Sequence, residues 1–276
     1  MFFKKSKEIV QEATNNEVAP SDISGFNELM RYIKEFSGVD LEQKRDITMQ
    51  RLSSFAKNNS ISTYAMLLSR IKSNTELRQD ILNLVTVNET YFYRELAQLK
   101  DVIAYAKSLG SARILCAPCS SGDEVYSIAM LAYEASLPNP LISITGIDIN
   151  SEAIAQCNAG EYSPRSLHRL SEEQKKQFFE NMGDKFLIKK SMLAKCEFKI
   201  INVFDDALFG LGKFDIVLSR NMMIYFDDDF RLKCIERLAK VLKSGGRLYA
   251  GHADLVPNSR EYEKKFINGS SFYERV

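Results

Sequence analysis

Short apolar runs alternate with amphipathic stretches over the carboxyl-terminal part of the chain, and this alternation limits the fold more than any other feature. Runs typical of buried strands lie at residues 113–117, 142–147, 198–201, 214–219 and 247–250. Helices are expected between them at about 123–135, 151–159 and 228–242. This order predicts an α/β fold built on a doubly wound, mostly parallel sheet, which binds ligands at the carboxyl ends of its strands.

The amino-terminal part carries helical signals instead. From Ser21 onward apolar residues recur at helical spacing, with Asp22 as an N-cap and Gly38 as the end of the first helix. Further helices are predicted at 42–58, 61–72 and 75–84. The chain therefore divides into a flexible arm at 1–20, an all-helical domain at 21–86, a linking segment with a helix at 87–110, and the sheet domain at 111–276.

Charge and cysteine content exclude several classes of protein. Lys and Arg number 37 against 36 Asp and Glu, so no overall positive field attracts nucleic acid. No run approaches the roughly 18 apolar residues of a membrane span, and residues 1–5 lack the apolar core of a signal peptide. The five cysteines are an odd number and widely spread, which favours reduced thiols. These features predict a cytoplasmic protein without membrane insertion.

A turn of small residues at 118–122 follows the first predicted strand and leads directly to Asp123 and Glu124. Such a turn at a helix start exposes backbone N–H groups to a ligand. It lacks the lysine of a Walker motif and the glycines of a dinucleotide fingerprint, and its acidic pair would repel phosphate. The two carboxylates suit a cation such as an amino-acid ammonium, or they simply favour the helix dipole.

Polar residues also end three later strands. Asp148 is placed to accept hydrogen bonds from both hydroxyls of a ribose, or to cap the next helix, and its spacing from the small-residue turn favours the ribose. Asn202 ends another strand, where an amide can read the edge of an adenine. Arg220, Asn221 and Tyr225 lie just beyond the strand at 214–219.

Cys116 and Cys119 have the spacing of a redox motif or of half a zinc site. A second such pair is missing from the sequence, and the acidic pair nearby disfavours a thiolate, so small side chains lining a ligand loop are the preferred interpretation. The histidines, His168 and His252, have no metal-site spacing. No metal is expected.

Four sequence blocks in order resemble the chemoreceptor methyltransferase (CheR) family, over roughly residues 21–276. They are Asn-Glu-Thr-Tyr-Phe-Tyr-Arg at 88–94, Ser-Ser-Gly-Asp-Glu-Val-Tyr-Ser at 120–127, Gly-Glu-Tyr at 160–162 and Ser-Arg-Asn-Met-Met-Ile-Tyr-Phe-Asp at 219–227. The chain departs from the family at Val125, where proline is usual, and at Pro118 and Cys119, which replace commoner small residues.

The resemblance implies a class I, Rossmann-like methyltransferase sheet with a helical amino-terminal domain and a small β-rich insertion near residues 180–200. It implies a monomeric protein-glutamate O-methyltransferase that uses S-adenosyl-L-methionine, leaves S-adenosyl-L-homocysteine, and esterifies glutamates on methyl-accepting chemotaxis receptors. The residues that it places around cofactor and substrate are Asn88, Thr90, Arg94, Glu124, Asp148, Asn202, Val203, Arg220, Asn221 and Tyr225.

A glutamate carboxylate with a pKa near 4.3 is already ionised at neutral pH, so methyl transfer needs alignment and desolvation but no general base. The resemblance assigns the two catalytic positions to Arg94, which would hold the carboxylate, and Tyr225, which would hydrogen-bond near the reacting atoms. Two alternatives remain open from the sequence: a non-catalytic S-adenosylmethionine-binding module and a methyltransferase for a small acid.

A basic face on the helical domain, formed by Lys44, Arg45, Arg51 and Lys57, is expected to dock on acidic receptor helices. Some relatives instead grip a tethering peptide at the receptor carboxyl terminus through a glycine-containing turn of the insertion. The corresponding segment here has only Gly183 and is short. Docking independent of the tether is therefore predicted.

Overall fold

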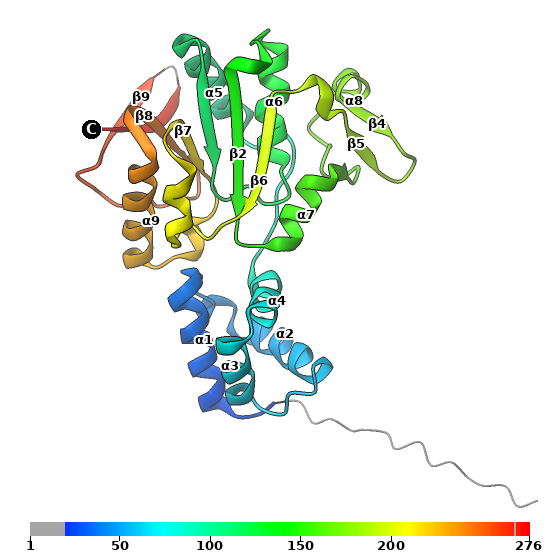
Figure 1. Cartoon of the computed structure of the whole chain (residues 1–276), viewed down its shortest axis with the longest axis vertical. Helices are drawn as coiled ribbons and strands as arrows, with labels where there is room; N and C mark the ends of the chain where they lie inside the picture. The colour runs from blue at the N-terminus through cyan, green and yellow to red at the C-terminus, as the bar shows by residue number, and fades with distance from the viewer. Residues whose placement is uncertain (1–19, 268) are drawn as a thin grey trace, which may run out of the picture.

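The computed structural model describes residues 20–267 and 269–276. Nearly all of the predicted flexible arm therefore lies outside the described residues. The described chain forms a helical domain below a sheet domain, joined by one extended segment after residue 85 (Figure 1). None of the described helices is long and apolar enough to cross a membrane.

Four helices build the amino-terminal domain: α1 (Ile23–Ser37), α2 (Arg45–Asn58), α3 (Tyr64–Ser73) and α4 (Thr75–Val85). Their apolar faces meet in a core of their own that includes Phe26, Ile33 and Leu52. Gly38 ends α1 in the left-handed conformation, as the sequence predicts. Asp22 precedes α1, but its carboxylate accepts hydrogen bonds from the amides of Tyr64 (2.7 Å) and Ala65 (3.0 Å), so it satisfies the start of α3 instead.

The main sheet has seven strands in the order β6-β2-β1-β7-β8-β10-β9. The strands are β1 (Ala112–Cys116), β2 (Ile142–Asp148), β6 (Lys195–Ile200), β7 (Phe214–Ser219), β8 (Leu242–Ala250), β9 (Tyr262–Ile267) and β10 (Ser270–Arg275). The first five strands in this spatial order are parallel, while β10 runs antiparallel to both β8 and β9. The predicted doubly wound, mostly parallel α/β fold is confirmed. The β9–β10 hairpin at one edge was not predicted.

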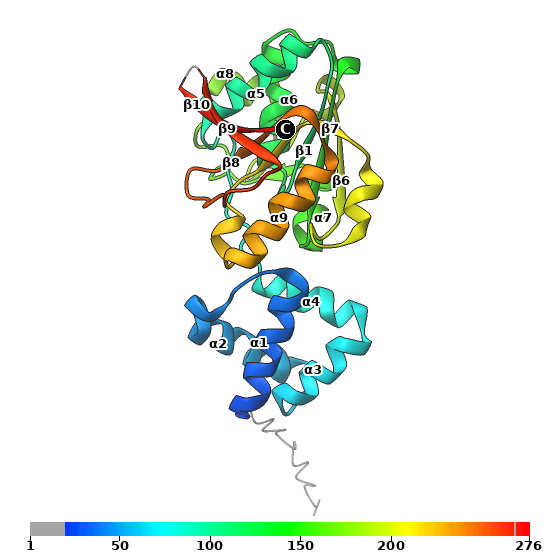
Figure 2. The same cartoon turned by 90° about the vertical axis from the view of Figure 1, so that its left-hand side faces the viewer.

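Helices cover both faces of this sheet (Figure 2). They are α5 (Leu96–Leu109), α6 (Asp123–Glu134), α7 (Ser151–Ala159) and α9 (Asp228–Val241). Alternate residues of β1 separate the two layers: Ile114 belongs to the core shared with α5 and α6, and Leu115 to the core shared with α9. The spatial order of the strands reverses between β1 and β7, so the ligand crevice is expected at their carboxyl ends.

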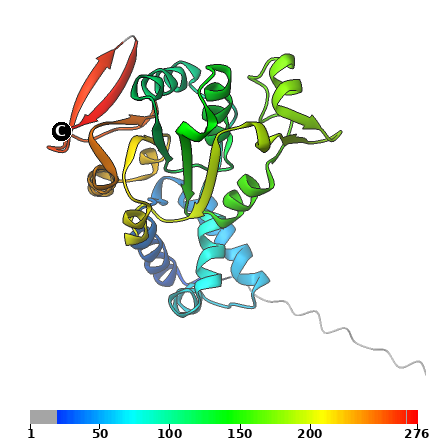
Figure 3. The same ribbon diagram turned by 45° about the horizontal axis from the view of Figure 1, so that its top comes forward.

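A second, three-stranded antiparallel sheet projects to one side of the main sheet (Figure 3). It consists of β3 (Glu161–Tyr162), β4 (Phe179–Asn181) and β5 (Phe186–Ile188), with α8 (Glu172–Phe178) leading into β4. The insertion therefore begins at residue 161 and its strands end at 188. Residues 195–200 were included in the range predicted for it, but they pair in parallel with β2 and form β6 of the main sheet.

Candidate functional site

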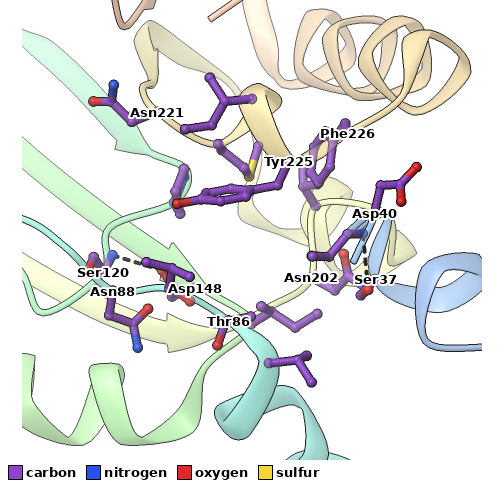
Figure 4. A pocket seen from close by; sticks show the side chains of 18 of the residues that line it. Ser37, Asp40, Thr86, Asn88, Ser120, Asp148, Asn202, Asn221, Tyr225 and Phe226 are labelled. Carbon is purple, nitrogen blue, oxygen red and sulfur yellow. Dashed lines mark hydrogen bonds between the residues drawn. The ribbon is translucent and has the colours of Figure 1, made fainter. Parts of the chain in front are cut away.

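A cavity of about 530 Å³ lies between the carboxyl edge of the sheet and the helical domain (Figure 4). The segments after β1, β2, β6 and β7 form one side, and the connection between α1 and α2 forms the other. The sheet side contributes Ala117, Pro118, Ser120, Ile147, Asp148, Ile149, Ile201, Asn202, Val203, Asn221, Met222, Ile224, Tyr225 and Phe226. The cavity thus lies where the sequence predicts a site.

A smaller cavity of about 50 Å³ adjoins the first, because both are lined by Val87, Pro118, Ser120 and Asn221. The residues that line only the smaller one include Thr90, Arg94, Glu124 and Arg220. Every candidate cofactor and catalytic residue of the sequence analysis lines one cavity or the other: Asn88, Asp148, Asn202, Val203 and Tyr225 the larger, Thr90, Arg94, Glu124 and Arg220 the smaller, and Asn221 both.

Asp148 presents a buried carboxylate to the larger cavity. Its Oδ2 accepts a hydrogen bond from the amide of Ser120 (2.8 Å), and its Oδ1 accepts one from the amide of Asn150 (2.9 Å). Burial raises the pKa of Asp148, and these amide bonds counteract the rise. The cap of α7 is Asn150, whose side chain accepts from the amide of Ala153, so Asp148 does not serve as the helix cap.

The loop between β1 and α6 is held by hydrogen bonds from the insertion and from α7. The hydroxyl of Tyr162 donates to the carbonyl of Ser121 (2.8 Å), and the thiol of Cys157 donates to the carbonyl of Ser120 (3.1 Å). Asp123 accepts a hydrogen bond from the Ser121 hydroxyl (2.6 Å), and burial raises the pKa of Asp123 to about 6. These contacts hold the loop that carries the Ser120 amide to Asp148.

Burial also raises the pKa of both thiols in the Cys116–Cys119 pair. Both side chains are buried and are free cysteines. A raised pKa opposes formation of the thiolate on which redox and metal chemistry depend. Within residues 20–267 and 269–276, no group of three or more His, Cys, Asp and Glu is arranged to hold a metal ion.

Arg220 is the centre of a buried ion network next to the smaller cavity. Its side chain is 3% exposed, and its guanidinium lies 2.6 Å from Oε2 of Glu124 and 3.1 Å from Oε2 of Glu95. It also donates to the carbonyl of Arg94 (2.7 Å). Burial raises the pKa of Glu124, and Arg220 opposes that rise. Two carboxylates against one guanidinium leave one net negative charge.

The network also borders the smaller cavity. Glu124 lines this cavity, and its carboxylate would attract an ammonium group placed there. Glu95 was missed by the sequence analysis; its position directly after Arg94 was the one available signal.

Arg94 and Tyr225 line the two adjoining cavities. Arg94 lines the smaller cavity, and its Nη1 donates to the carbonyl of Glu89 (2.9 Å). The ring of Tyr225 lies across the larger cavity, with its hydroxyl directed toward the side of Ser120 and Asp148 (Figure 4). Lys44 of the helical domain lies 5.4 Å from the centre of that ring. Burial raises the pKa of Tyr225, which therefore remains a hydroxyl donor at neutral pH.

Asn202 lies in the cavity wall, but its amide group joins the two domains. Its Nδ2 donates to the carbonyl of Phe36 (2.5 Å), and its Oδ1 accepts from the amide of Phe204 (2.9 Å). The side chain is therefore occupied by the end of α1 and is not the free amide that the sequence suggested for reading an adenine edge.

Two groups of polar contacts join the helical domain to the sheet domain. On one side Lys34 forms ion pairs with Asp40 (2.9 Å) and with Asp227 at the start of α9 (2.7 Å). On the other side Gln79 of α4 donates to the carbonyl of Ile149 (2.8 Å), and Asn83 accepts from the amide of Ser151 (3.0 Å). The cavity lies between these two groups of contacts.

The four basic residues predicted to form one docking face do not share a face. Lys44 lines the larger cavity, Arg45 lies over the ring of Phe26 in α1, and Arg51 donates to the carbonyl of Leu84 in α4. Lys57 is exposed. Arg45, Arg51 and Lys57 follow one another at six-residue steps, and six residues rotate a helix by about one and two-thirds turns. Their spacing therefore distributes them around α2 and not along one face of this helix.

Comparison with known proteins assigns the chain to a protein family. Residues 88–272 match the model of the CheR methyltransferase, SAM binding domain. The chain is 45% identical over 261 residues to a chemotaxis protein methyltransferase of Campylobacter jejuni, covering 94% of this chain and 98% of that protein. It is 31% identical over 246 residues to a chemotaxis protein methyltransferase of Vibrio anguillarum, covering 83% and 88% of the two chains.

Proposed function

The chain belongs to the CheR methyltransferase family and is an S-adenosylmethionine-dependent methyltransferase of chemotaxis, and from this premise we propose that it esterifies glutamate side chains on chemoreceptors. The observation that carries the proposal is the arrangement of the two adjoining cavities. Buried carboxylates for a ribose and an ammonium stand next to Arg94 and Tyr225, which suit an incoming carboxylate.

Asp148 and Glu124 fit the two ends of the cofactor. The ribose hydroxyls would donate to the carboxylate of Asp148, which lines the larger cavity, and the methionine ammonium would approach the carboxylate of Glu124, which lines the smaller one. S-adenosylmethionine supplies a methyl group activated by its sulfonium. Between these two anchors lie Pro118, Ser120 and Asn221, which line both cavities.

The substrate side of the reaction needs a cation and a hydrogen-bond donor. In the proposal, Arg94 holds the glutamate carboxylate, and the Tyr225 hydroxyl orients the reacting region from the opposite wall. No base is required, because the carboxylate is already ionised near neutral pH. In the proposal, the rate of methyl transfer increases because the reacting groups are aligned and because water is excluded between the two domains.

The test of the proposed function is methyl transfer to protein. The full chain is incubated with methyl-labelled cofactor and membranes that contain a chemoreceptor. A base-labile methyl ester on the receptor, absent when its methylated glutamates are changed to alanine, is the expected result. Label that appears only on small acids would contradict the proposal. Because the receptor segments that would be methylated are cytoplasmic helices, we also propose that the enzyme acts in the cytoplasm. A further part of the proposal is that it acts as a monomer.

Arg94→Ala is expected to lower the turnover of receptor methylation by about 10–100-fold, as misplacement of a reacting group does. Cofactor affinity should change much less, because Asp148 and Glu124 remain. Turnover is measured at saturating receptor, and affinity is measured by calorimetry. Arg169→Ala removes an exposed arginine that lines neither cavity and serves as the control. Undiminished turnover in Arg94→Ala would refute the assigned role.

We also propose that docking does not need a receptor tethering peptide. The turn between β4 and β5 is tight: Met182 donates its amide to the carbonyl of Lys185 (2.8 Å), and the Gly183 amide donates to the side chain of Asn181 (2.8 Å). This short turn supports the proposal. Removal of the terminal peptide from a cognate receptor is expected to leave the methylation rate within about twofold. A tether in use would raise the overall avidity by about 100-fold or more above either affinity alone. A large rate loss would overturn it.

A further inference from the structure

One partly buried carboxylate next to the site, Asp254, has no part in the function proposed above. It belongs to the turn that follows β8, where the amide of Asp254 donates to the carbonyl of Gly251 (3.0 Å). Its Oδ2 accepts two further hydrogen bonds, from the amide of Gly251 (2.9 Å) and from the amide of Asn221 (2.5 Å). The side chain therefore joins its own turn to the segment that carries Asn221 and Tyr225.

The segment that Asp254 holds turns sharply at Asn221. Asn221 has a φ of 58°, in the left-handed region, which asparagine adopts more readily than most other non-glycine residues. A residue persists in such a conformation when the surrounding structure fixes it, and such residues concentrate at functional sites. Asn221 lines both cavities, and Tyr225 lies one turn further along. Asp254 contacts this residue through the hydrogen bond that its Oδ2 accepts from the Asn221 backbone amide.

The same turn is also fastened to the segment that carries Arg94. Gln98 of α5 donates to the carbonyl of Ala250 (2.9 Å), and the amide of His252 donates to Oε1 of Glu95 (3.4 Å). The turn that contains Asp254 therefore contacts the segment that carries Tyr225, through Asn221, and the segment that carries Arg94, through Glu95. Gly251 is required for the close approach, since a Cβ there would lie 2.9 Å from the Asn221 amide nitrogen and 3.0 Å from Oδ2 of Asp254.

The electrostatics of Asp254 agree with this geometry. Burial raises the pKa of Asp254, and the backbone hydrogen bonds from Asn221 and Gly251 oppose the rise. A carboxylate that accepts backbone N–H groups from two segments fixes one segment relative to the other.

We infer that Asp254 is a positioning residue for methyl transfer: it sets the backbone of residues 221–225 and thereby the position of the Tyr225 side chain, without touching the cofactor. The inference rests on the proposed function for its substrate. It differs from a purely structural role because the loss of Asp254 should affect turnover more than cofactor affinity.

The experiment compares Asp254→Ala with Asp215→Ala in the full chain. Asp215 is a matched control at the opposite end of β7, where its carboxylate likewise accepts a backbone amide, that of Arg113 (2.9 Å), far from both cavities. Asp254→Ala should lower turnover at saturating cofactor and receptor by about 10–100-fold, the effect of a displaced catalytic group, while cofactor affinity measured by calorimetry changes less than about fivefold. Asp215→Ala should leave turnover within about twofold.

Gly251→Ala provides a second, independent variant, should Asp254→Ala fold poorly. Its added methyl group displaces the turn from Asn221 while the carboxylate is kept, and the same loss of turnover is expected. Turnover within twofold of the parent in a folded variant, or equal losses of turnover and cofactor affinity, overturns the inference. Failure of the parent chain to methylate any receptor would instead refute the proposed function, while cofactor affinity remains measurable in all variants.

Discussion

Replacing Arg220 by alanine is expected to destabilise the folded chain by about 3–5 kcal/mol, because it leaves two buried carboxylates without their cation. Arg220 is 3% exposed and contacts Glu95 and Glu124, which are 14% and 12% exposed. The measurement is urea unfolding followed by circular dichroism, with the midpoint and slope analysed together.

A control and a rescue separate charge from packing in this variant. Arg237→Ala removes an arginine that pairs with a well-exposed partner, Asp206, and should cost much less. Arg220→Met combined with Glu95→Gln and Glu124→Gln removes all the charges together and should recover part of the loss. If Arg220→Ala unfolds at the parent midpoint, the network does not contribute as described.

Asp148→Ala should raise the dissociation constant of S-adenosylmethionine by at least about tenfold, since each hydrogen bond to a charged acceptor contributes roughly 1.5–3 kcal/mol. Two effects act in the same direction: the ribose hydroxyls lose their acceptor, and the amide of Ser120 loses the carboxylate that holds it (2.8 Å). Calorimetric titration of the purified chain measures the change.

The control for this variant is Asp123→Asn. Asp123 is as buried as Asp148 and also supports the loop after β1, but it lines neither cavity. Its substitution should leave cofactor affinity within about threefold while changing stability. Affinity of Asp148→Ala within about twofold of the parent would remove Asp148 from the site.

The main sheet was predictable from local patterns, and so were site candidates at strand ends such as Asp148, whereas Asn88, Thr90 and Arg94 came only from the family resemblance. Asp148 is the last residue of β2 and Arg220 directly follows β7, and parallel strands bring their carboxyl ends to one edge. The β9–β10 hairpin had no such signal: the pattern of Tyr262–Ile267 is mostly exposed and charged, so it lacks the apolar run of a core strand.

Residues that act through long-range contacts could not be found from the sequence. Glu95 and Asp254 are ordinary acidic residues in their local context, and only the folded chain places them against Arg220 and the Asn221 amide. The orientation of the basic residues on α2 also depends on the fold. Their charges are evident in the sequence, but the neighbouring helices α1 and α4 decide where Arg45 and Arg51 point.

The two-domain construction of the larger cavity has a consequence for the catalytic cycle. One wall belongs to residues 37–44 and the other to the sheet edge, and polar contacts such as Lys34 with Asp227 join the two domains. A ligand that contacts both walls adds its binding free energy to the association of the domains. Exchange of spent product for fresh cofactor must work against that same free energy. A variant with a weaker domain junction is therefore expected to exchange product for cofactor faster.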